Sequence, residues 1–342
     1  MSVLSILLAA AVSLPPAVVG ADLSSLPRVE AAGAVFREHA DAAPADLLTL
    51  LRARGLNTVR LRVWHTPPDG TCTTAATTAL AARAQAAGLA VLLDLHYSDT
   101  WADPGHQAPP RAWQGLPVGA LADSVRAYTA GVMRALAARG VVPTCVQLGN
   151  EITGGLLWDT GRTDTEAHRD NLALLLRAGM AGMDDSLPPG AARPEVMIHI
   201  DNAGDRRLLD GLARRGVLYD VIGVSYYPWW HGPLDKLEAN LRDLATRYGK
   251  GVLVVETAYP WTLRWFDTTH NLVGQESQLL DGYPATFEGQ ARFLAEVTRI
   301  VREVPGGLGR GVVWWEPAWL GPGSAWENMG WVDERGVLRG GP

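Results

Sequence analysis

The chain has 342 residues, of which 47% are hydrophobic and 19% are charged, and its formal net charge is −6. This composition predicts a globular protein with a large core, and the absence of Lys/Arg clusters argues against a nucleic-acid-binding surface. The length fits either two domains or a single α/β barrel.

The chain begins with an apolar segment from Val3 to Val12, which is too short to span a bilayer. We expect residues 1–15 to be a signal peptide with its cleavage site near the small residues "AVS" at 11–13, although the usual basic segment is missing. The alternative is a first core strand with an irregular start. A signal peptide would make the protein secreted or periplasmic, with residues 16–342 as the mature domain.

Beyond the leader, short apolar runs alternate with segments rich in Ala, Leu and Arg. Eight runs are predicted strands: residues 17–23, 57–64, 90–97, 144–151, 195–201, 220–227, 251–257 and 311–317. Apolar residues at i, i+3 and i+4 predict helices over 44–54, 73–87, 121–139, 168–183, 206–215, 235–248 and 286–304. The pattern predicts a single-domain (β/α)8 TIM barrel, with strands that are apolar throughout because both faces are buried.

An open, doubly wound sheet is the competing architecture. Such a sheet usually carries a Gly-rich phosphate-binding turn after its first strand, whereas this chain has "GADLSSLPRVE" there. The sequence therefore favours the closed barrel.

The two cysteines are too few for a disulfide framework. Cys72 follows one predicted strand and Cys145 begins another, so a barrel places them at opposite ends. We expect two unpaired thiols.

Functional side chains stand at the carboxyl ends of most predicted strands, where barrel enzymes carry their catalytic groups. They are Arg60, Arg62, Trp64, Asp94, His96, Tyr97, Asn150, Glu151, His199, Asp201, Tyr226, Tyr227, Glu256, Trp314, Trp315 and Glu316. A purely structural barrel has no need of so many, and their convergence predicts an active site.

Glu151 and Glu256 end the fourth and seventh strands, which lie on opposite sides of a barrel mouth. Hydrolysis of a glycosidic bond needs one protonated and one ionised carboxyl group, placed on either side of that bond. Arg60 lies on an inward face and would keep Glu256 ionised. The alternative is that each Glu caps a following helix.

Two further residue types allow more than one interpretation. His96 is either a core histidine or a substrate contact. It could also bind a metal ion together with Asp99, Asp103 and His106, but their spacing matches no standard ligand pattern. The 13 Trp residues suit either stacking against sugar rings or packing.

Over almost the whole mature chain the sequence resembles glycoside hydrolase family 53, the endo-β-1,4-galactanases. The motifs are "GLNTVRLRVWHTPPDG", "LDLHYSDTWADPGHQAPPRAW", "VQLGNEITGGLLWDTG", "DVIGVSYYPWWHG", "VVETAYPWT" and "GVVWWEPAW". The resemblance implies a retaining hydrolase that cleaves internal β-1,4-galactosidic linkages in galactan and type I arabinogalactan, a pectin side chain. We expect a monomer whose partner is the polysaccharide, with no nucleic-acid or membrane partner. The alternatives are a related mannanase or cellulase, or a barrel that binds carbohydrate without hydrolysis.

The resemblance also implies roles for individual residues. Glu151 is the general acid/base, Glu256 is the nucleophile, Asn150 contacts the hydroxyl beside the reacting carbon, and Tyr226 or Tyr227 orients Glu256. The other expected substrate-binding residues are Arg60, His96, Asp99, Trp101, Trp229, Trp230, Trp315 and Trp319. Each of these tryptophans could instead serve packing.

Bacterial members of the family often bind calcium between the last two long loops. Candidate ligands in this chain are Asp267, His270, Asn271, Asn328 and Asp333. Their spacing differs from that of the family, so we expect no cofactor and keep calcium as the alternative.

Overall fold

The computed structural model describes residues 17–320 and 323–342. The expected signal peptide, residues 1–15, lies outside the described residues. No helix in the described part of the chain is long and apolar enough to cross a membrane.

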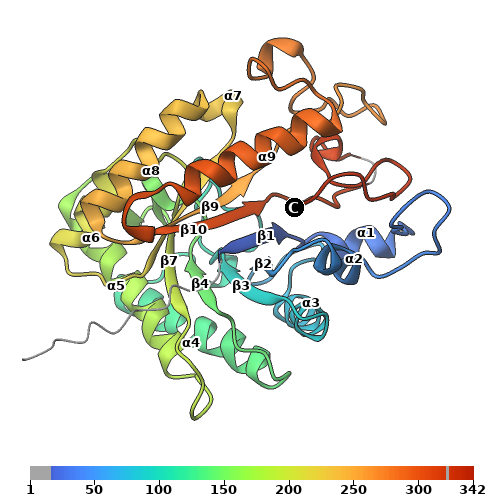
Figure 1. Ribbon diagram of the computed structural model, residues 1–342. Coiled ribbons are helices and arrows are strands. Elements are labelled where there is room, and N and C mark those ends of the chain that lie inside the picture. Colours follow the sequence, from blue (N-terminus) through green and yellow to red (C-terminus); the bar gives the residue numbers. More distant parts are fainter. Residues whose placement is uncertain (1–16, 321–322) are drawn as a thin grey trace, which may run out of the picture.

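Eight parallel strands close into a barrel, in the order β1-β10-β9-β8-β7-β4-β3-β2 (Figure 1). They are β1 (Val18–Asp22), β2 (Thr58–Val63), β3 (Ala90–Leu95), β4 (Cys145–Leu148), β7 (Glu195–Ile200), β8 (Val221–Tyr226), β9 (Gly251–Thr257) and β10 (Gly309–Trp314). A short antiparallel pair, β5 (Gly155–Leu156) and β6 (Gly161–Arg162), follows β4. The predicted barrel is confirmed, and each predicted strand overlaps an observed one.

The helices lie outside the strands (Figure 1). They are α1 (Leu26–Ala31), α2 (Leu47–Ala53), α3 (Thr74–Ala86), α4 (Val118–Ala137), α5 (Glu166–Asp184), α6 (Arg207–Arg214), α7 (Pro228–His231), α8 (Leu234–Tyr248) and α9 (Phe287–Arg302). Three of the longer helices begin at a threonine, Thr73, Thr165 or Thr286, whose side chain accepts a hydrogen bond from the third backbone N–H of its helix. These caps fix where the chain leaves each loop.

The inside of the barrel changes from apolar to charged along the strands. Side chains two residues apart share one face of a strand, and Leu92 and Asp94 show the change on β3. Cys145 and Gln147 repeat it on β4, and Met197 and His199 on β7. The apolar members form one buried cluster with Val221, Leu253, Val255 and Val313. The polar members therefore gather at the carboxyl end.

A β-bulge in β9 aims Glu256 at the barrel axis. Val254 pairs with Val224 of β8, but the next pair joins Glu256 to Ser225, so β9 carries one extra residue. Val255 already belongs to the interior cluster, so without the bulge strict alternation would turn Glu256 toward the helices.

Both cysteines are buried free thiols, as expected from their places at different ends of the strands.

Candidate active site

A cavity of about 590 Å³ lies at the carboxyl ends of the strands. Its lining includes Glu151, which follows β4, and Glu256 of β9. Aromatic side chains form much of the remaining wall. The size and the mixture of aromatic and polar groups are typical of a small-molecule or oligosaccharide site.

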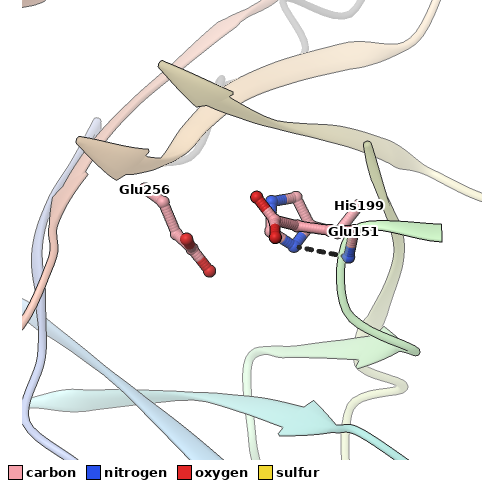
Figure 2. Close-up of side chains that lie close together, drawn as sticks. All are labelled: Glu151, His199 and Glu256. Atoms are coloured by element: carbon pink, nitrogen blue, oxygen red, sulfur yellow. Dashed lines mark hydrogen bonds between the residues drawn. The ribbon is translucent and has the colours of Figure 1, made fainter. Parts of the chain in front are cut away.

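The two carboxyl groups face each other across this cavity (Figure 2). A carboxylate oxygen of Glu151, one of Glu256 and a ring nitrogen of His199 lie within 4.8 Å of one another. Carboxyl groups of retaining glycosidases are about 5–5.5 Å apart, and those of inverting enzymes about 6.5–9.5 Å. The observed separation fits the retaining arrangement.

Glu151 lies in an environment that favours its protonated form. Burial raises the pKa of Glu151 well above its usual value, and the nearby negative charge of Glu256 raises it further. The backbone of Glu151 has a φ of 50°, which is unusual for a residue other than glycine. This conformation brings its N–H to 3.3 Å from Nδ1 of His199.

Glu256 is held by two donors that favour its ionised form. Arg60 Nη1 lies 2.7 Å from Oε1, and the Tyr227 hydroxyl donates to Oε2 at 3.1 Å. Burial raises the pKa of Glu256 to about 7, and Arg60 opposes this rise. Because Arg60 opposes the effect of burial at Glu256, the proton of the pair belongs on Glu151.

Arg60 is the centre of a buried ion-pair network. Its guanidinium contacts Asp22 at 3.1 Å, Asp94 at 2.8 Å and the side-chain oxygen Oδ1 of Asn150 at 2.7 Å, besides Glu256. The side chain is 0% exposed. Arg60 is therefore not placed as the substrate contact that was expected. Because protein groups enclose its guanidinium, it can affect a substrate only through Glu256 and Asn150.

His96 and Asp99 do not line this cavity either. His96 Nδ1 accepts hydrogen bonds from the Trp64 indole and the backbone N–H of Ala102, both at 3.2 Å, and its Nε2 lies 2.9 Å from Asp94. Asp99 accepts hydrogen bonds from the backbone N–H groups of Thr66 and Arg111 and so joins two loops. The structure gives both residues a supporting position in place of the expected substrate contact.

The expected aromatic subsites divide in two. Trp101, Trp230, Trp315 and Trp319 line the cavity, and the rings of Trp101 and Trp319 stack with their centroids 5.9 Å apart. Trp229 lines a neighbouring pocket instead. The cavity is also lined by Asp201, one of the predicted strand-end side chains, and by His231 and Trp326, to which the sequence interpretation gave no role. Trp326 lies in a late Gly-rich loop, and the sequence signal for a place in the cavity wall was that the residue is a tryptophan.

Only one of the two adjacent tyrosines reaches the catalytic pair. Tyr227 bonds Glu256, whereas the Tyr226 hydroxyl donates to the carbonyl of Gly232 at 2.9 Å and its ring stacks on Phe293. The alternation of side chains along a strand places neighbours on opposite faces. Tyr226 is therefore not the residue that orients Glu256, and it does not line the cavity that holds the two glutamates.

Tyr227→Phe is expected to lower kcat/KM for the hydrolysed substrate by roughly 10–100-fold, because the Glu256 carboxylate loses the hydrogen bond that the Tyr227 hydroxyl donates. Tyr226→Phe removes an equivalent hydroxyl from the opposite face and is the matched control, with an expected change of less than about threefold. Steady-state kinetics of the two purified variants test this pair. Equal losses in both would contradict the assignment.

The expected calcium ligands do not come together as one set. Asp333 is bound to Arg339 at 3.1 Å and to two backbone N–H groups, and His270 lies against the Trp265 ring. The side-chain oxygens of Asn271 and Asn328 are buried without a partner. Asp267, the remaining candidate, accepts hydrogen bonds from the backbone N–H groups of Thr269 and Gly323. The five candidates thus make separate contacts, and no step below uses a calcium ion.

Three supporting residues had no role in the sequence interpretation: Asp22, Gln147 and Ser225. Asp22 and Gln147 bind Arg60, and Ser225 binds Glu151. Each points into the barrel from a strand, so the period of two along the strands was the signal that could have found them.

Comparisons with known proteins agree with this geometry. Residues 18–338 match the profile of Glycosyl hydrolase family 53. A "Probable arabinogalactan endo-beta-1,4-galactanase A" of Aspergillus fumigatus is 40% identical over 313 residues, which cover 88% of this chain and 84% of that protein. An "Arabinogalactan endo-beta-1,4-galactanase A" of Emericella nidulans is 37% identical over 92% of this chain and 90% of its own length. The Ignisphaera aggregans GH53 catalytic domain superposes with a TM-score of 0.88 at 33% identity, covering 95% and 94% of the two chains.

Proposed function

The chain belongs to glycosyl hydrolase family 53, and we infer that it is an endo-β-1,4-galactanase acting on arabinogalactan. Its catalytic pair supports a retaining mechanism, and the observation that carries this step is the 4.8 Å limit on the separation of Glu151, Glu256 and His199. A water molecule between the carboxyl groups, as inversion requires, needs a wider gap.

The two carboxyl groups divide the reaction between them. An oxygen of Glu256 attacks the anomeric carbon while Glu151 gives its proton to the glycosidic oxygen. The bond between the anomeric carbon and the glycosidic oxygen breaks. Glu151, now ionised, takes a proton from water, and that water attacks the same carbon and releases Glu256. Two inversions leave the product with the β configuration of the substrate.

Asn150 offers one free donor to the sugar beside the reacting carbon. Its side-chain oxygen already accepts from Arg60 and Gln147, and one N–H of its amide donates to the carbonyl of Ala102 at 2.8 Å. The second N–H is left for a substrate hydroxyl, since Asn150 lines the cavity. A hydrogen bond to this hydroxyl strengthens in the transition state.

Linear β-1,4-galactan is expected to release reducing ends, with rates on mannan and cellulose lower by about 100-fold or more. Mannan and cellulose test the related glycanases, and galactan binding without hydrolysis would support a carbohydrate-binding barrel. Proton NMR of the first products should show the β anomer before mutarotation. An α anomer would contradict the retaining mechanism, and faster hydrolysis of mannan or cellulose would contradict the substrate.

We further propose that the protein acts as a monomer outside the cell or in the periplasm. Both catalytic carboxyl groups and the aromatic wall come from one chain, which supports an active monomer. The expected signal peptide supports the location. N-terminal sequencing of the protein from the culture medium or periplasm would test cleavage near residue 15, and light scattering would test the oligomeric state.

A further inference from the structure

A short chain of hydrogen bonds runs behind Glu151. Ser225 Oγ on β8 donates to Glu151 Oε1 at 2.7 Å, and His199 Nε2 on β7 lies 2.9 Å from the same Oγ. His199 and Ser225 are 0% and 1% exposed. Because water does not reach them, each hydrogen in the chain must be placed between protein groups.

The tautomer of His199 follows from counting donors. Burial, with the positive charge of Arg60, lowers the pKa of His199 well below its usual value, so the ring carries one hydrogen. Nδ1 faces Asn150 Oδ1 at 2.9 Å, the donor Nε2 of Gln147 at 3.1 Å and the backbone N–H of Glu151 at 3.3 Å. Asn150 Oδ1 already accepts from Arg60 and Gln147, whereas the Glu151 N–H has no other acceptor among the described residues. Nδ1 therefore accepts, and the hydrogen lies on Nε2.

This tautomer decides what Ser225 can do. The Ser225 oxygen accepts from Nε2–H of His199, so its single hydrogen is free only for Glu151 Oε1. A proton on Oε1 would then face the hydrogen of Ser225. Oε2 has no donor from the protein in the part of the chain that is described.

We propose that His199 and Ser225 act as a positioning pair that keeps the acid proton of Glu151 on Oε2, the oxygen left for substrate. The proposal rests on the galactanase function inferred above. In the first step the proton leaves Oε2 for the glycosidic oxygen as the bond to the anomeric carbon breaks. In the second, Oε2 takes the proton of the attacking water. Oε1 keeps the hydrogen bond from Ser225 throughout.

Ser225→Ala is expected to lower kcat/KM on galactan by about 10–100-fold. With 2,4-dinitrophenyl β-galactobioside the expected loss is less than about threefold, because dinitrophenolate leaves without a proton and kcat/KM reports only the first step. A merely structural effect would lower both values together. Ser186→Ala is the matched control, since this buried serine bonds the Gly182 carbonyl on α5.

The pH profile gives a second readout. The hydrogen bond from Ser225 lowers the pKa of Glu151, so its removal raises that pKa. The alkaline limb of kcat/KM on galactan, where Glu151 loses its proton, should move to higher pH in Ser225→Ala. The other charged or titratable groups near Glu151, namely Glu256, His199, Asp201, Arg60 and Tyr227, are unchanged in this variant.

A double-mutant cycle tests whether His199 acts through Ser225. His199→Phe removes the Nε2 hydrogen but keeps a ring, and its loss on galactan should not deepen when Ser225→Ala is added. The positioning pair would be overturned if the activity losses of His199→Phe and Ser225→Ala multiplied in the double variant. It would also be overturned if Ser225→Ala lost equal activity on both substrates while the wild type was active. A wild type without galactan hydrolysis would instead refute the proposed function. If His199→Phe fails to fold, Ser225→Ala with its two substrates and pH profile decides alone.

Discussion

Glu256→Ala is expected to lower kcat on galactan by a factor on the order of 10⁴ or more, with the fold intact. The reason is that Glu256 is the carboxylate that Arg60 and Tyr227 hold ionised at the cavity, so no other group in the described site can form the glycosyl-enzyme. Reducing-end release measures the loss, and circular dichroism checks the fold.

Added azide separates the roles of the two glutamates. In Glu256→Ala, azide occupies the place of the nucleophile and should convert 2,4-dinitrophenyl β-galactobioside into the α-glycosyl azide. In Glu151→Ala the glycosyl-enzyme still forms, and azide attacks it from the other face to give the β-glycosyl azide. Opposite products would show that the assignments are reversed.

A glutamate at the amino end of the barrel is the control. Glu195 begins β7 and pairs with Arg310 at 2.6 Å, and Glu195→Ala should keep at least about half of the wild-type kcat. Full activity of Glu256→Ala would contradict its role as nucleophile.

The barrel itself could be predicted because its pattern is local. The continuous apolar runs of the strands, and the period near 3.6 of the helices, can be recognised in short stretches of sequence. The threonines that cap α3, α5 and α9 stand within three residues of a predicted helix start. The capping hydrogen bonds also depend only on neighbouring residues.

The orientation of single side chains could not be predicted in the same way. The bulge that turns Glu256 inward is a difference in length between β9 and its neighbours, which no stretch of β9 reveals. The choice between Tyr226 and Tyr227 depends on the same register. Arg60 was expected at the substrate because its buried partners Asp22 and Asp94 come from two other strands.

Arg60→Met is expected to lower the free energy of unfolding at neutral pH by about 3–5 kcal/mol, because three buried carboxylates lose their common cation. It should also shift the acid limb of kcat/KM on galactan to higher pH. Arg60 lowers the pKa of Glu256 against the effect of burial, so without Arg60 the nucleophile becomes ionised only at higher pH.

The stability loss should shrink as the pH falls. Burial alone would raise the pKa of Asp94, but Arg60 and His96 bring it below its usual value in the folded wild type. Asp94 therefore contributes stability above its unfolded pKa, and this contribution is lost as the pH falls through the lower, folded pKa. In Arg60→Met the unpaired carboxylates gain protons on acidification, so the two proteins converge. Urea unfolding at several pH values measures this difference.

Arg83→Met separates a buried ion-pair network from an exposed one. Arg83 bonds Glu30 and Asp46, each at 2.7 Å, but its side chain is 41% exposed, so the expected loss is less than about 1 kcal/mol. The acid limb of kcat/KM for Arg83→Met should match that of the wild type, because the ion pairs of Arg83 lie on the outer helices. If Arg60→Met cost no more than Arg83→Met and kept the wild-type acid limb, the buried cation would not be what keeps Glu256 ionised. Its charge would then have to be stabilised by Tyr227 and by solvent in the cavity.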